Sequence, residues 1–175
     1  MKKITFVFGS IAGLVVSLTM AISAMTCYVN KQFQPSMWLG YTSMIVAFSL
    51  IFVGVKKIRD DYNGGAITFG KAFKAGCYIA LIASTFYVLT WLVEFYLFIP
   101  DFMDKYAAHQ IAQAQNSGAS AADIASTKSQ MATYSQLYKN PIMVIVLTYF
   151  EILPIGIVIA LISALVLKRK AKSVN

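Results

Sequence analysis

Charged residues are scarce in this chain of 175 residues. They make up 13% of it, while 58% of the residues are hydrophobic and the mean hydropathy is +0.66. Ordinary soluble domains carry roughly a quarter charged residues. Because so little charge cannot cover a soluble surface, the composition excludes a soluble globular enzyme and a disordered tail.

Cysteine and histidine are scarce as well. Cys27 and Cys77 have no C-x-x-C spacing, and His109 is the only histidine. This excludes a disulfide framework and gives no support to a zinc site. No phosphate-loop, nucleophile-elbow or dinucleotide-binding motif occurs. We therefore expect no cofactor, no metal and no enzymatic activity, and we expect His109 to be a solvated helix residue.

Long hydrophobic runs take the place of charge. Four stretches are nearly free of charged residues: 4–29, 36–55, 75–99 and 141–167. A helix that rises about 1.5 Å per residue needs about 20 apolar residues to cross the hydrocarbon core of a membrane. Such continuous runs contradict the alternation of a transmembrane barrel. The sequence predicts an all-α fold, a single membrane domain of four transmembrane helices spanning residues 1–175.

The first run also has some features of a cleaved secretory signal. It follows Lys2 and Lys3 and contains small residues near its end. The hydrophobic part of a signal is usually about 7 to 15 residues long, and the run 4–29 exceeds that. We interpret it as a retained span.

Basic residues predict the orientation of the spans, because lysine and arginine concentrate in cytoplasmic loops. With the N-terminus inside, four of them lie outside: Lys31, Lys105, Lys128 and Lys139. Eleven lie inside: Lys2, Lys3, Lys56, Lys57, Arg59, Lys71, Lys74, Lys168, Arg169, Lys170 and Lys172. We expect a multi-pass protein of the inner (plasma) membrane with both termini in the cytoplasm. Its basic inner loops should meet the lipid bilayer at anionic headgroups rather than nucleic acid.

The inner loop, residues 56–74, carries the most specific turn signal. We expect contacts at Arg59, Asp60, Tyr62, Asn63, Gly64 and Gly65. Such clusters of Asn, Asp and Gly are typical of turns, and Thr68 can cap the helix that follows. That helix is either a short interfacial helix or the first turns of the third span.

The outer loop, residues 100–140, is rich in alanine, serine and glutamine. Asp101 marks a helix start, residues 116–118 break the pattern, and Ser120 with Asp123 resembles a capping box. The loop therefore predicts an extracytoplasmic helical hairpin. It has too few large apolar residues to form a separate domain.

Two acidic residues lie within the spans. Glu94 is five residues from the outer end of the third span, and Glu151 is ten from the outer end of the fourth. A charged group in hydrocarbon is costly and usually faces the bundle interior, a partner or a watered cavity. Glu151 is therefore a candidate either for binding a proton or cation, or for a neutral hydrogen bond between two helices.

Helical spacing adds neighbours to both acids. Thr90 and Tyr87 share the face of Glu94, and Thr148 lies one turn before Glu151. A proline one turn after Glu151 frees the carbonyl of Phe150. The candidate intramembrane polar site therefore comprises Glu151, Glu94, Pro154, Thr148 and Thr90.

Small residues recur at spacing four in three of the runs. They are Gly9, Gly13, Ser17 and Ala21; Gly76, Ala80 and Ser84; and Gly156, Ala160 and Ala164. Small residues at this interval let lipid-embedded helices approach closely. They predict one packed bundle or a homo-oligomer.

Two segments resemble a known family. They are the inner-loop region with Arg59-Asp60, Tyr62-Asn63-Gly64-Gly65 and Thr68-Phe69-Gly70, and the segment Glu151-Ile152-Leu153-Pro154-Ile155-Gly156. The chain resembles, over nearly its whole length, a bacterial membrane-protein family catalogued as domain of unknown function 4199. The resemblance implies a small four-span membrane protein with no assigned activity, substrate or cofactor.

Two functions follow from these features. The first is a non-enzymatic assembly or interaction component, which contacts a protein partner through its inner loop and outer hairpin. The alternative is a small oligomeric transporter or channel for protons or cations that uses Glu151 and Glu94. The sequence favours the first, since no intramembrane Lys, Arg or His can pair with either acid.

The orientation can be tested with a single cysteine at Ser126 in a chain that lacks Cys27 and Cys77. We expect a membrane-impermeant maleimide to label Ser126→Cys from outside intact cells, because the basic residues place the hairpin there. A matched Asn63→Cys should react only after the membrane is opened. Labelling of Ser126→Cys from the cytoplasmic side alone would contradict the orientation.

Overall fold

The computed structural model describes residues 1–31, 33 and 37–170. Ser36, the expected start of the second span, and Lys172 lie outside the described residues. Within these residues, two π-helical turns occur: η1 (Ile58–Tyr62) and η2 (Glu94–Phe98). The α-helices are α1 (Lys2–Asn30), α2 (Met37–Lys57), α3 (Phe69–Val93), α4 (Phe102–Asn116), α5 (Ala121–Tyr138) and α6 (Pro141–Leu167).

In the part of the chain that the structure describes, four helical segments are long and apolar enough to cross a membrane: Lys2–Asn30, Trp38–Tyr62, Phe69–Phe98 and Pro141–Leu167. Each exposes large apolar side chains away from its neighbours, among them Leu18, Leu97 and Phe150. Such a surface suits lipid and would be unusual on a water-soluble protein. The predicted all-α fold with four membrane-spanning helices is confirmed.

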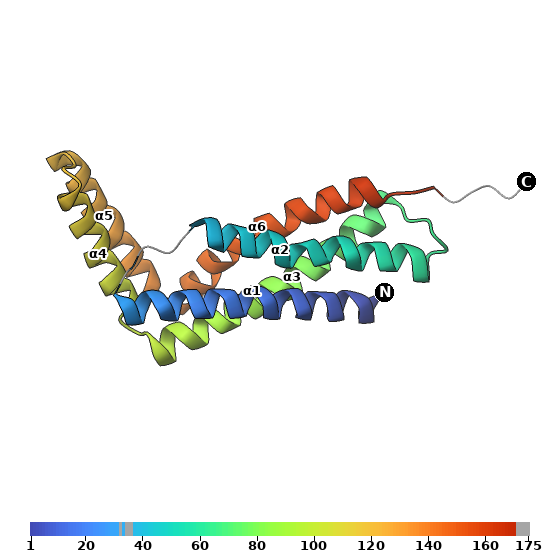
Figure 1. Ribbon diagram of the computed structural model, residues 1–175, viewed down its shortest axis with the longest axis horizontal. Helices are drawn as coiled ribbons and strands as arrows, with labels where there is room; N and C mark the ends of the chain where they lie inside the picture. Colours follow the sequence, from blue (N-terminus) through green and yellow to red (C-terminus); the bar gives the residue numbers. More distant parts are fainter. Residues whose placement is uncertain (32, 34–36, 171–175) are drawn as a thin grey trace, which may run out of the picture.

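The four long helices run side by side in one bundle (Figure 1). Helix α3 has its most extensive contacts with α6 and α1, and α2 completes the bundle against α1 and α6. Helices α4 and α5 lie at one end, which we call the hairpin end; the N-terminus lies at the other, the terminal end (Figure 1).

Glycines set the distance between α3 and its two neighbours. A Cβ added at Gly76 of α3 would lie 2.8 Å from the Cβ of Ala160 in α6. One added at Gly13 of α1 would lie 2.7 Å from the Cβ of Phe86 in α3. The predicted small-residue stripes are therefore internal helix contacts, and only glycine permits these approaches.

The terminal end of the bundle is solidly packed. Large side chains from α2, η1 and α3 that are completely buried there include Phe48, Ile51, Val55, Ile58 and Ile79. The chain is also joined across this end, since Ile67 N donates to Arg169 O at 3.0 Å and Arg169 N donates to Ile67 O at 2.9 Å. This two-bond bridge holds the loop before α3 against the end of α6.

The inner loop is shorter than the sequence indicates. The second helical segment continues past Val55 to Tyr62, and the side chains of Val55 and Ile58 are completely buried against the bundle. The exposed pair of Lys57 and Asp61, 2.7 Å apart, adds only a small stabilisation of about 0.2–0.5 kcal/mol. Thr68 accepts a hydrogen bond from Lys71 N, as predicted, and α3 follows as one helix. The stretch after Thr68 is thus the first turns of the span.

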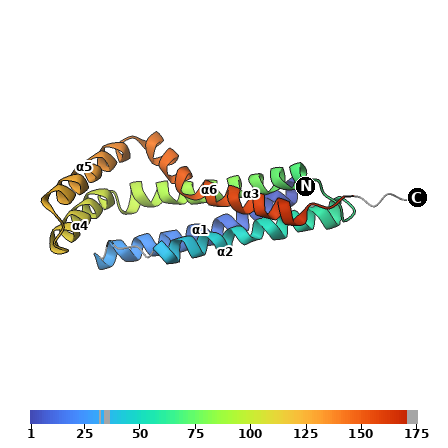
Figure 2. The same cartoon turned by 90° about the horizontal axis from the view of Figure 1, so that it is seen from above.

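The hairpin follows its local sequence signals. Helix α4 begins directly after Asp101, and Gly118 takes a positive φ of 73° in the turn after α4. Ser120 Oγ accepts from Asp123 N at 3.2 Å and donates to Asp123 Oδ2 at 2.7 Å. Figure 2 shows α4 and α5 extending beyond the bundle, and they bury only Met103.

Three polar side chains fix the base of the hairpin to α1. Tyr28 OH donates to Asp101 Oδ1 at 2.7 Å, and Lys105 Nζ lies 2.7 Å from Asp101 Oδ2. Lys105 Nζ also donates to Tyr28 OH at 3.0 Å. The Lys105 and Tyr28 hydrogen bonds hold the pKa of Asp101 below its usual range, so this contact is intact at neutral pH.

The glycine contact can be tested by a pair of substitutions in α3. Gly76→Ala should lower the free energy of unfolding by about 1–3 kcal/mol, because the new methyl group overpacks against α6. Gly70→Ala is the control: nothing lies within 4 Å of its Cβ position, and alanine favours a helix by up to about 1 kcal/mol. Equal unfolding free energies for the two variants would contradict the packing.

Candidate functional site

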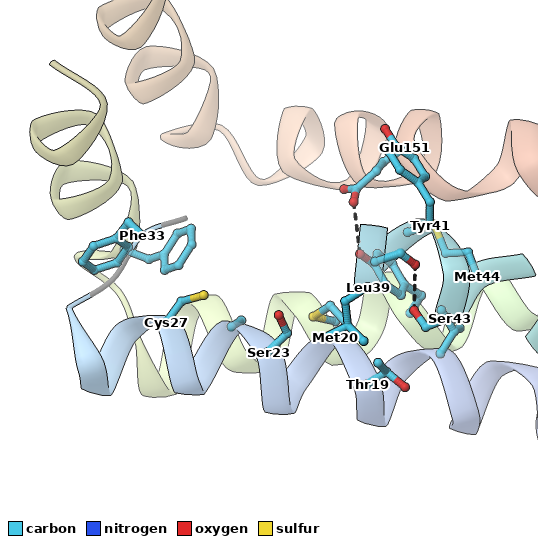
Figure 3. A pocket seen from close by; sticks show the side chains of 15 residues that line it. Thr19, Met20, Ser23, Cys27, Phe33, Leu39, Tyr41, Ser43, Met44 and Glu151 are labelled. Atoms are coloured by element: carbon cyan, nitrogen blue, oxygen red, sulfur yellow. Dashed lines mark hydrogen bonds between the residues drawn. The ribbon is translucent and has the colours of Figure 1, made fainter. Parts of the chain in front are cut away.

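A cavity of about 220 Å³ opens inside the bundle toward the hairpin end (Figure 3). All four spans contribute to its wall, together with Phe33 and with Phe102 at the start of α4. Apolar side chains dominate the wall. The polar side chains that line it are Thr19, Ser23, Tyr41, Ser43, Tyr87 and Glu151.

Glu151 projects from α6 into this cavity, opposite Thr19, Met20 and Ser23 of α1 (Figure 3). Tyr87 of α3, which is 5% exposed, donates its OH to Glu151 Oε1 at 3.2 Å. This bond joins α3 to α6 inside the membrane region. A hydrogen bond between two helices was one of the two hypotheses for Glu151 that the sequence allowed, and this contact is such a bond.

Hydroxyl groups on the cavity wall are already used as donors. Thr19 donates to Val15 O at 2.9 Å, and Ser43 donates to Gly40 O at 2.7 Å. Each hydroxyl oxygen keeps lone pairs that can accept. The cavity therefore presents acceptors on α1 and α2 opposite the carboxyl of Glu151, which suits a proton, a cation or a hydrogen-bond donor.

Glu94 does not line the cavity that contains Glu151. It begins the π-helical turn η2, is 5% exposed, and lines a second cavity, of about 460 Å³, between α1 and α3. Thr90 lines the same cavity, as the helical spacing predicts, and so does Thr26 of α1. Within the described part of the chain, Glu94 Oε2 has no hydrogen-bond partner.

The candidate intramembrane site is thus divided into two. Glu94 and Thr90 line one cavity, while Glu151 lines the other with Tyr87, which the sequence had placed on the face of Glu94. Thr148 is buried and donates to Val144 O at 2.7 Å within its own helix. Pro154 is exposed on α6 and lines neither cavity.

The candidate contact residues of the inner loop form a compact turn. Arg59 and Asp60 make two hydrogen bonds with each other, at 2.7 and 3.1 Å. Gly64 and Gly65 take positive φ angles of 58° and 79°, which other residues rarely adopt. Tyr62 is exposed. The Arg59–Asp60 pair and the glycines thus shape the turn, and Tyr62 is available for contact.

Sequence reasoning missed part of the central cavity and misjudged one residue. The polar wall residues Thr19, Ser23 and Ser43 gave only a weak signal, since isolated hydroxyls are common in membrane helices. The expectation that His109 is solvated is wrong: it is half-buried, with its ring centroid 6.1 Å from that of Phe33. Among the described residues, no group of three His, Cys, Asp or Glu side chains could hold a metal ion.

A family model described as a protein of unknown function, DUF4199, matches residues 7–169. The chain belongs to the DUF4199 family. The match spans all four membrane helices and the hairpin, so both cavities lie within the DUF4199 region. No curated protein and no solved structure matches the chain. The resemblance carried by the inner turn and by the Glu151–Gly156 segment is confirmed at the level of the family.

Proposed function

We propose that this DUF4199 protein is a non-enzymatic interaction component of the inner membrane, which meets a protein partner through α4 and α5. Both termini lie in the cytoplasm in this proposal. The observation that carries it is the exposure of the hairpin: its two helices bury only Met103, whereas each membrane helix buries one face.

The base of the hairpin supports the same proposal. The contact among Tyr28, Asp101 and Lys105 fixes the start of α4 to α1, and Phe102 packs edge-on against Trp91 with ring centroids 5.4 Å apart. A segment that is held firmly at its base and exposed along its length presents a defined surface outside the membrane. At the terminal end, the basic residues around the Arg59 turn suit anionic headgroups.

A photoreactive side chain in place of Gln130, which is exposed on α5, tests this function. We expect a cross-linked product of one defined mass from this position in intact cells, because the partner covers the hairpin. The matched position is Tyr62 at the terminal end, from which this product should be absent. Deletion of residues 107–135 should release the same partner during purification, and undiminished co-purification would refute the proposal.

A second candidate function is uptake of a proton or monovalent cation at Glu151. The central cavity favours it, since a carboxyl inside the membrane region faces acceptor groups from two other helices. The closed packing at Phe48, Ile51 and Ile79 blocks a straight path to the terminal end. Transport by this route would therefore require the bundle to rearrange or to form an oligomer.

Proton and cation flux into liposomes tests the second candidate. Glu151→Gln keeps the shape of the side chain and its acceptor for Tyr87 but removes the charge, so we expect it to abolish flux while folding is preserved. Glu94→Gln is the control, because its carboxyl lines another cavity. Absence of flux in the unmodified protein, or equal flux in unmodified protein and Glu151→Gln, would exclude this role.

A further inference from the structure

The second cavity, an open groove between α1 and α3, is lined by a buried carboxyl group. Glu94 is 5% exposed, lines this groove, and its Oε2 has no hydrogen-bond partner among the described residues. Burying such a group without a partner is costly. None of the residues that line the groove is basic. A positively charged partner for Glu94 must therefore come from outside the groove itself.

The backbone around Glu94 is also unusual. Helix α3 changes to π-helical geometry at this residue: Glu94 N donates to both Thr90 O and Trp91 O, and Ile99 N donates to Glu94 O at 3.0 Å. Short π-helical turns occur frequently at functional sites. The turn begins at Glu94, one helical turn after Thr90 and one before Phe98, so Glu94 lies midway along the α3 wall of the groove.

Thr26 and Glu94 both present hydrogen-bond acceptors to the groove. Thr26 donates its hydroxyl proton to Ile22 O at 2.6 Å, so that its oxygen faces a ligand only as an acceptor. An ionised carboxylate is an acceptor as well. A ligand that complements these groups must donate several hydrogen bonds, and a positive charge on it would offset that of Glu94.

The residues that line the groove favour an organic cation over a metal ion. Hard divalent cations such as Ca²⁺ take about 6–8 oxygen ligands, while the side chains here supply one carboxylate and two hydroxyls. The rest of the lining is apolar, and its rim carries the exposed side chains of Ile22, Val93 and Phe98. Such walls suit a hydrocarbon chain that reaches the groove from the surrounding lipid.

We propose that the groove between α1 and α3 binds a phospholipid by its primary ammonium group, with Glu94 as the charged acceptor. Phosphatidylethanolamine has this chemistry: three N–H donors on a cation, attached to acyl chains. The hydroxyl oxygen of Thr26 accepts a further hydrogen bond, and the apolar walls contact one acyl chain. The site is separate from the hairpin surface and from the Glu151 cavity, so the proposal stands independently of either proposed function.

A hydrophobic carbodiimide tests the contact directly, because it activates a buried carboxyl and couples it to a primary amine in contact with it. The full chain is reconstituted in vesicles of phosphatidylethanolamine and phosphatidylcholine, treated, and analysed by peptide mass spectrometry. We expect a phosphatidylethanolamine adduct on the peptide that contains Glu94. In vesicles of phosphatidylcholine alone, whose headgroup has no N–H, the adduct should be lost.

Two variants and one control complete the test. Glu94→Gln should lose the adduct, and so should Ala21→Phe, which keeps the carboxyl but fills the groove from α1. Glu151→Gln should retain it in full. The proposal is overturned if no lipid adduct forms on Glu94 in the folded unmodified protein, if Ala21→Phe leaves it unchanged, or if Glu94 couples instead to a lysine of another protein chain.

Discussion

The close approach of α3 to both α1 and α6 is the contact on which the rest of this bundle depends. Lipid gives packed helices no hydrophobic gain, so association relies on van der Waals contact over short distances. Gly13, Gly76 and Gly156 supply it, each with a neighbouring carbon within 3 Å of where a Cβ would stand. These glycines lie in the half of each helix nearer the terminal end.

Larger residues follow in the other half, and the helices separate there. Along α3, Gly76 and Ala80 give way to Tyr87 and Trp91, and along α6 the positions before Gly156 carry Ile152 and Thr148. Both cavities open in this half of the bundle, on opposite flanks of α1. The gradient of side-chain size along the helices thus creates the space that two acidic residues occupy.

Local signals in the sequence predicted most of the fold. The spans follow from uninterrupted hydrophobicity, and Thr68, Ser120 and Gly118 mark helix ends through contacts within a few residues. The charged stretch before Tyr62 misled the prediction, because Ile58 within it is buried against the bundle while Lys56, Lys57, Asp60 and Asp61 remain exposed on the helix. The division between Glu94 and Glu151 could not be predicted, since it depends on how α1, α3 and α6 are rotated against one another.

The bridge between Ile67 and Arg169 restricts how this bundle can move. Because it joins the loop before α3 to the residue after α6, the two helices share a fixed register at that end. Sliding one past the other by a helical turn, about 5.4 Å, would break both hydrogen bonds. Piston-like motion of α6 along α3 is therefore disfavoured at the terminal end of the bundle.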